Sequence, residues 1–115
     1  SSFTSLEKAI LTDAPQAYGG GDIFKSHEEQ IELLQRFTRG MHSISRTSAF
    51  FWPEVTDFSQ HRVMLDVAGG SAAHSIGAAL KLPNVKVIFL DFRQVCEIAQ
   101  EYINQYGLQE RIKSQ

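Results

Sequence analysis

The sequence predicts an α/β fold in which helices precede the first half of a doubly wound parallel sheet. Two short apolar runs, residues 63–67 and 85–90, have the composition of strands, and the first is typical of a strand that is buried on both faces. A glycine-rich turn follows the first run, and a helical pattern follows each of them. Strand, helix, strand and helix in that order form a parallel pair with a right-handed crossover, which is the opening of a Rossmann-like sheet.

Residues 1–61 are expected to form a helical segment that leads into this sheet. A capping box at residues 4–7 predicts a short helix that runs to about Leu11. Residues 14–22 contain a proline and three consecutive glycines, so this stretch is expected to be a loop.

A longer helix is expected over residues 26–52. A second capping box at residues 26–29 opens it, and Pro53 disfavours helix at the residue before it. Gly40 costs this helix about 1 kcal/mol relative to alanine. We therefore expect a close approach of another backbone at Gly40.

Residues 62–115 are expected to form the N-terminal half of a Rossmann-like binding domain. After the glycine-rich turn, Ile76, Ala79 and Leu80 mark the inner side of a helix that packs on the sheet. Asp91 closes the second strand, and a further apolar periodicity predicts a helix that ends at a glycine. The sequence therefore predicts one α/β unit after the helical segment.

The composition excludes several classes of partner. The 115 residues are 43% hydrophobic with a formal net charge of −2, which gives no basic excess for nucleic acid or an anionic membrane. No apolar run approaches the roughly 20 residues of a membrane span, so we expect a cytoplasmic protein.

The single cysteine, Cys96, is expected to be buried and unreactive. The four histidines show no metal-ligand spacing, so each is expected at the surface or in helix packing and no metal site is expected.

The glycine-rich turn and the acid after the second strand define the candidate ligand site. Nucleotide-like ligands lie at the carboxyl edge of a parallel sheet, beside the N-terminus of the following helix. Asp91 stands 25 positions after Asp66. A carboxylate at that point can accept hydrogen bonds from both hydroxyls of a ribose.

Charge decides which ligand suits this turn. A dinucleotide would place its pyrophosphate over the turn, where Asp66 would repel it. S-adenosylmethionine carries a sulfonium and an ammonium and no phosphate, so nearby carboxylates are tolerated or favourable. A nicotinamide-dependent oxidoreductase is therefore disfavoured. Asp66 also has a structural interpretation, as a carboxylate that anchors the turn by accepting backbone N–H groups.

Three stretches carry a resemblance to a known family. Residues 65–72, Leu-Asp-Val-Ala-Gly-Gly-Ser-Ala, and residues 89–92, Phe-Leu-Asp-Phe, resemble motif I and the second-strand acid of plant caffeate-type and bacterial antibiotic-type O-methyltransferases. Residues 37–45 are similar to the helix before that family's first strand. The resemblance covers about residues 37–112. It implies a Rossmann-like methyltransferase sheet, and methyl transfer from S-adenosylmethionine to a hydroxyl of a small aromatic or polyketide-like acceptor.

The resemblance also implies which residues bind the ligands. Phe37 and Met41 would line the acceptor pocket, although core packing of an amphipathic helix explains them equally well. A serine of the same helix and the aromatic residue after the acid complete the cofactor contacts. The cofactor-binding residues implied in this way are Ser45, Asp66, Ala68, Gly69, Gly70, Ser71, Asp91 and Phe92.

The chain departs from the family's motif, Asp-Val-Gly-Gly-Gly-Thr-Gly, at two glycine positions. Ala68 and Ala72 stand where the first and last glycines are usual. Alanine strongly disfavours positive φ, so either these residues are not left-handed or the affinity for the cofactor is reduced. The alternative to an enzyme is therefore a non-catalytic, methyltransferase-like binding or interaction module.

The resemblance further implies a longer protein. In the family, the groups that bracket the adenine and the histidine that deprotonates the acceptor follow the third strand, so no catalytic residue is expected in this chain. The family also has an N-terminal dimerisation domain, so a homodimer is expected for the full-length protein. The first strand is central in the family's sheet. We therefore expect the outer edge of residues 63–67 to be covered by another chain or by protein outside this sequence.

Overall fold

The computed structural model describes Leu11 and residues 26–115, and the chain divides into two compact units, 1–30 and 31–115. In the first unit, the Ser26 hydroxyl accepts the Glu29 N–H at 3.3 Å, and the Glu29 carboxylate accepts the Ser26 N–H at 2.9 Å. This reciprocal pair confirms the capping box expected there. The earlier helix and the loop at residues 14–22 lie outside the described residues, apart from Leu11, which is helical.

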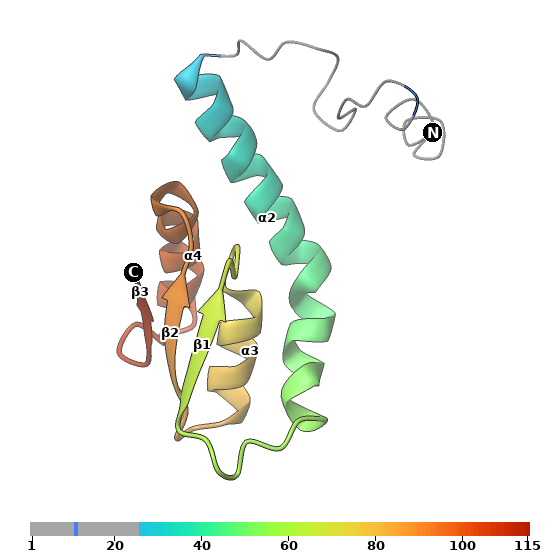
Figure 1. The fold of residues 1–115 in the computed structure, drawn as a ribbon, viewed down its shortest axis with the longest axis vertical. Helices are drawn as coiled ribbons and strands as arrows, with labels where there is room; N and C mark the ends of the chain where they lie inside the picture. The colour runs from blue at the N-terminus through green and yellow to red at the C-terminus, as the bar shows by residue number, and fades with distance from the viewer. Residues whose placement is uncertain (1–10, 12–25) are drawn as a thin grey trace. The chain divides into compact units, whose positions relative to one another are not determined.

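The helix α2 spans His27–Phe51 and continues into a short 3-10 helix, η1, over Trp52–Glu54 (Figure 1). The helix expected over 26–52 is therefore confirmed to within one residue at each end. Pro53 is buried in η1, where its fixed φ suits the start of a helical turn. The buried side of α2 consists of Thr38, His42 and Ala49.

Three parallel strands form one sheet in the order β1-β2-β3 (Figure 1). They are β1, Val63–Val67; β2, Lys86–Leu90; and β3, Ile112–Ser114. β1 and β2 run in register from Val63 opposite Lys86 to Val67 opposite Leu90. The predicted parallel pair is confirmed, with the second strand beginning one residue later than expected.

The helices α3, Ala73–Lys81, and α4, Arg93–Gln105, follow β1 and β2. Ile76 and Ala79 are buried as predicted, but Leu80 is exposed. Leu80 lies in the last turn of α3, between the buried Ala79 and the exposed Lys81. Cys96 is half-buried rather than buried, and burial raises the pKa of its thiol, in keeping with low reactivity. The core comprises Ala72, Ile76, Ala79, Val85, Val87, Phe89, Ala99, Ile103, Leu108 and Ile112.

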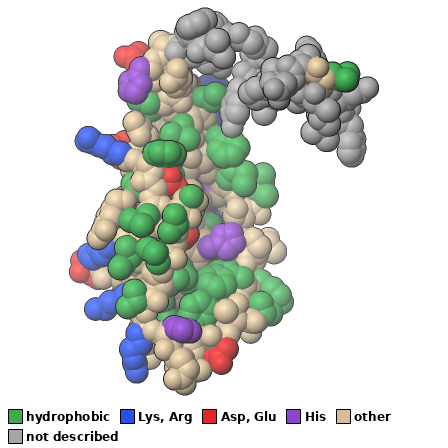
Figure 2. All heavy atoms as spheres, viewed as in Figure 1, with side chains coloured by type: hydrophobic (Ala, Val, Ile, Leu, Met, Phe, Trp, Pro, Cys, Tyr) green, Lys and Arg blue, Asp and Glu red, His purple; other side chains and the backbone are tan. Residues whose placement is uncertain are grey.

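The sheet is covered on one face in the described part of the chain. Val87 and Phe89 of β2 are buried, whereas Val63, Leu65 and Val67 of β1 are 58–65% exposed. The prediction that β1 is buried on both faces is therefore wrong for residues 26–115, because its alternate side chains point away from the core. Hydrophobic side chains accordingly gather over the strands in the view of Figure 2. Among the described strands, β1 pairs with β2 alone, so its outer edge is bare.

Arg111 ties the end of α3 to the sheet. Its guanidinium donates to three backbone carbonyl oxygens at 2.6–2.7 Å. They belong to Ala79, Leu82 and Val85, at the C-terminus of α3 and in the turn into β2. The positive charge also complements the negative end of the helix dipole. This side chain therefore holds the backbone that connects α3 to β2 in place.

The close backbone approach occurs at Gly77 rather than at Gly40. A Cβ at Gly77 would overlap the carbonyl oxygen of Ala49, so α2 and α3 contact each other through their backbones there. A Cβ at Gly40 would meet nothing within 4 Å in the described structure. Gly77 is thus required by packing, and Gly40 is not.

The same substitution is therefore expected to act in opposite directions at these two glycines. We predict that Gly77→Ala destabilises the chain by about 3 kcal/mol, because the new methyl group forces α2 and α3 apart. Gly40→Ala is the matched control and should stabilise α2 by up to about 1 kcal/mol. Urea unfolding followed by circular dichroism measures both. Equal midpoints for the two variants would contradict the packing argument.

Candidate functional site

The turn between β1 and α3 is strongly left-handed. Ala68, Gly70 and Ala72 have φ of 56°, 61° and 63°. Glycine adopts this conformation freely, whereas for alanine it costs roughly 1–2 kcal/mol per residue. Both alanines therefore keep the backbone that glycine favours, and the possibility that they are not left-handed is excluded.

Asp66 lies beneath this turn. A Cβ on Gly69 would overlap the Phe89 ring and lie 2.7 Å from the Asp66 carboxylate, so only glycine fits. The Asp66 carboxylate accepts the hydroxyl of Ser75, a fully buried residue of α3. The anchoring interpretation of Asp66 is therefore supported, but its partner is a helix hydroxyl rather than a backbone N–H.

Asp91 lies across the same turn, at the carboxyl edge of the sheet. One carboxylate oxygen accepts the Gly70 N–H at 2.9 Å, and the other accepts the Phe92 N–H at 2.7 Å. Each oxygen of an ionised carboxylate has two acceptor sites. The backbone thus orients Asp91 and leaves one acceptor site on each oxygen.

Ser71 is held from the side of α2. It is 4% exposed, and its hydroxyl lies 2.8 Å from Nδ1 of His42. The His42 ring stacks on Tyr102 of α4, with centroids 3.6 Å apart and an interplanar angle of 11°. The pKa of His42 is lowered, first by burial and then by the positive charge of Arg46. His42 thus packs between helices as expected, but its hydrogen bond to the turn was not foreseen.

The remaining predicted residues lie on α2 and directly after Asp91. Phe37 and Met41 are 52% and 40% exposed on α2, so core packing does not account for them within residues 26–115. Ser45 is half-buried on the same helix. Phe92 follows Asp91, and its ring is 76% exposed. The structure brings together Asp66, Ala68, Gly69, Gly70, Ser71 and Asp91.

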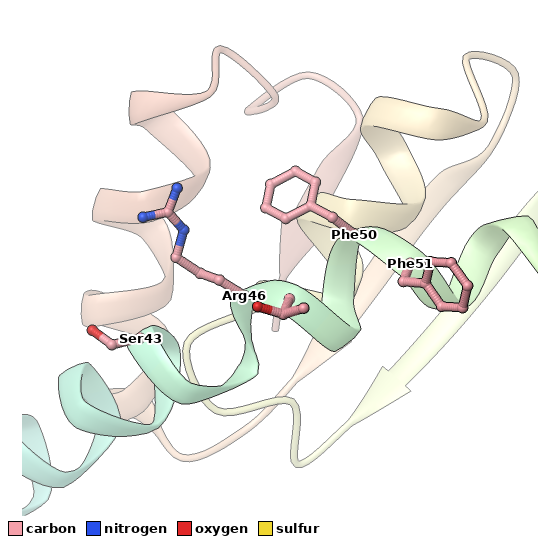
Figure 3. A pocket seen from close by; sticks show the side chains of 5 residues that line it. Ser43, Arg46, Phe50 and Phe51 are labelled. Atoms are coloured by element: carbon pink, nitrogen blue, oxygen red, sulfur yellow. The ribbon is translucent and has the colours of Figure 1, made fainter.

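A hollow of about 560 Å³ lies along the C-terminal part of α2, lined by Ser43, Arg46, Thr47, Phe50 and Phe51 (Figure 3). None of these described lining residues belongs to the turn.

Within residues 26–115 and Leu11, no group of three acidic, histidine or cysteine side chains could hold a metal ion. The described helices likewise include none long and apolar enough to cross a membrane.

A family model described as O-methyltransferase domain matches residues 3–115. The chain belongs to the O-methyltransferase domain family. The family that the three sequence stretches resembled is thereby confirmed, together with the Rossmann-like methyltransferase fold.

Individual members of this group are similar over most of the chain. The L-tyrosine C(3)-methyltransferase of Streptomyces lavendulae is 29% identical over 93 residues. The solved S-adenosylmethionine-dependent methyltransferase SibL is 34% identical with a TM-score of 0.59, over 69% of this chain. The mitomycin 7-O-methyltransferase MmcR is 23% identical with a TM-score of 0.78, over 97% of this chain.

The chain spans about a quarter to a third of the length of these relatives. The match covers 81% of this chain but 25% of the tyrosine methyltransferase. It covers 23% of SibL and 34% of MmcR. Dependence on S-adenosylmethionine is the general chemistry of the family. Membership of the family does not by itself establish the acceptor or the partners of the whole protein.

Replacing Ala68 or Ala72 by glycine relieves the strain of positive φ. The net effect on stability is expected to depend on whether the methyl group that is lost is buried. Ala68→Gly removes an exposed methyl group and should stabilise the chain by about 0.5–1 kcal/mol after the entropy cost of glycine. Ala72→Gly relieves similar strain but also removes a fully buried methyl group, so its net effect should be near zero or destabilising. Thermal unfolding of the two variants checks this. A loss of stability in Ala68→Gly would show that its φ is not strained.

Proposed function

We propose that this chain forms the cofactor-binding half of an S-adenosylmethionine-dependent O-methyltransferase. Its acceptor is a hydroxyl of a small aromatic or polyketide-like molecule. The observation that carries the proposal is Asp91, which two backbone N–H groups orient at a left-handed turn between parallel strands. S-adenosylmethionine supplies an activated methyl group when it is bound.

The adenosine end of the cofactor is assigned to Asp91 and Phe92. The acceptor site left on each Asp91 oxygen suits one of two adjacent ribose hydroxyls. The exposed ring of Phe92 offers an apolar surface to the adenine. The Asp66 carboxylate next to the turn opposes a pyrophosphate there, which favours this cofactor over a dinucleotide.

The methionine end is assigned to the turn itself and to Ser45. Gly70 leaves the backbone of the turn open to close approach, whereas the missing side chain of Gly69 makes room for Phe89 and Asp66 below the turn. Ala68 adds one methyl group where glycine would have none. The hydroxyl of Ser71 supplies a polar group beside them. Ser45 lies on the helix that carries the nearby His42, and is assigned to the cofactor by the family resemblance alone.

The acceptor is assigned to the side of α2 that carries Phe37 and Met41. Both side chains are large, apolar and exposed, which suits an aromatic ring. The curated relative acts on L-tyrosine, itself a small aromatic molecule. Alignment of donor and acceptor accounts for much of the expected acceleration, and we assign deprotonation of the acceptor to a group outside the described residues.

The proposed enzyme is cytoplasmic and a homodimer in its full-length form.

A second candidate function is that of a non-catalytic, methyltransferase-like module. The observation that favours the module is the strain of two left-handed alanines, which lowers the stability of the cofactor turn.

Calorimetric titration separates these functions. We expect S-adenosylhomocysteine to bind the chain with a dissociation constant on the order of 10 μM, about −7 kcal/mol. NAD should not bind, because its pyrophosphate would lie over the turn beside the Asp66 carboxylate. Binding of NAD without S-adenosylhomocysteine would overturn the proposal. Absent or millimolar binding of S-adenosylhomocysteine would favour the module.

Asp91→Asn tests the assigned ribose contact. The amide keeps the size of the side chain, but one of its two polar atoms donates and can no longer accept a hydroxyl or a backbone N–H. We expect affinity for S-adenosylhomocysteine to fall at least about tenfold, since hydrogen bonds to charged groups contribute about 1.5–3 kcal/mol. Glu97→Gln, an exposed carboxylate on α4, is the charge-matched control. Unchanged affinity in Asp91→Asn would remove Asp91 from the site.

A further inference from the structure

We infer that His42 is a positioning residue that holds Ser71, and through it the cofactor turn, against helix α2. The inference rests on the proposed function only for its consequence, cofactor affinity. The contact itself joins residues 29 positions apart in the sequence. It links the helix assigned to the acceptor with the turn assigned to the cofactor.

The His42 ring is fixed on two sides. Its Nδ1 lies 2.8 Å from the Ser71 hydroxyl, and its face stacks on Tyr102 at 3.6 Å. One helical turn earlier, the Arg39 guanidinium bonds the Glu101 carboxylate at 2.8 Å, which also joins α2 to α4. The ring therefore reaches the turn from a rigid junction of two helices rather than from a mobile side chain.

The turn has a particular need for such a contact. Ser71 stands between two left-handed residues, Gly70 and Ala72, so its position constrains the peptide planes on both sides. Asp91 holds the turn through the Gly70 N–H. His42 holds it one residue further on, through a side chain that is itself buried. Strained backbone persists only where surrounding contacts over-determine it.

Burial also keeps the ring neutral. The pKa of His42 is lowered by burial and by Arg46, so the imidazole carries no charge at pH 7. A neutral ring can donate or accept at Nδ1 according to its tautomer, and either role pairs with a hydroxyl. The His42 ring then has no positive charge of its own that would repel a sulfonium ligand near the turn.

Two substitutions divide the ring's roles. His42→Phe keeps the stack on Tyr102 and loses the hydrogen bond, whereas His42→Asn keeps a polar atom near the Nδ1 position and loses the stack. The first readout needs no ligand and is amide hydrogen exchange at Gly70 and Ala72, whose N–H groups bond Asp91 and the Gly69 carbonyl. We expect exchange there to accelerate about tenfold in His42→Phe, which is the effect of a loss of about 1.4 kcal/mol. Exchange should return towards wild type in His42→Asn. Unchanged exchange in His42→Phe overturns the inference whether or not the chain binds a cofactor.

The second readout is the affinity for S-adenosylhomocysteine in a double-mutant cycle. We expect His42→Phe to weaken binding about fivefold alone and to have no further effect in a Ser71→Ala background. Additive losses would show that His42 does not act through Ser71. Arg36→Ala, the control, breaks an exposed ion pair with Glu32 within α2 and should leave affinity within about twofold. A wild-type chain that binds no S-adenosylhomocysteine would refute the proposed function, and the exchange result would still decide the role of His42.

Discussion

The left-handed path of the backbone between β1 and α3 is the constraint on which the rest of the described structure depends. In the five residues after Val67, three adopt positive φ, and two of those are alanines. Such a path lowers stability, so it requires contacts that compensate for it. The surrounding elements supply three of them from separate directions. Asp66 and Ser75 join below the turn, Asp91 bonds Gly70 from β2, and His42 bonds Ser71 from α2.

Contacts at Gly77 and Arg111 explain where α3 packs against the neighbouring elements. Gly77 lets α2 lie directly against α3, because a side chain there would overlap the Ala49 carbonyl. That approach brings the buried side of α2 towards the turn, where His42 reaches Ser71. Arg111 holds the C-terminal end of α3 by bonding one carbonyl of its last turn and two that follow it. The position of α3 after the turn is thus determined at its middle and at its C-terminal end as well as by the sheet.

The sequence was sufficient for features that depend on local pattern. Apolar runs and the terminal acid predicted the parallel pair and the direction of Asp91 towards the turn, because strand period and turn chemistry are local. It was not sufficient for contacts between distant segments. The hydrogen bond of His42, the need for Gly77 and the carbonyl contacts of Arg111 each join residues brought together by packing. Burial of β1 was overpredicted for a related reason, since an apolar run does not say which face neighbouring elements cover.

The two aspartates of the site show how similar residues come to different roles. Asp66 lies under Gly69, and its carboxylate is engaged with a hydroxyl inside α3. Asp91 lies at the open edge of the sheet, and its partners are backbone N–H groups that leave acceptor sites on both oxygens. A ligand with adjacent hydroxyls can therefore bind Asp91 without breaking the contacts that hold the turn. The Asp66 carboxylate instead supports the strained backbone, through its bond to Ser75 of α3. The proposed recognition of the ribose therefore falls to Asp91, which follows β2, and the support of the turn to Asp66 of β1.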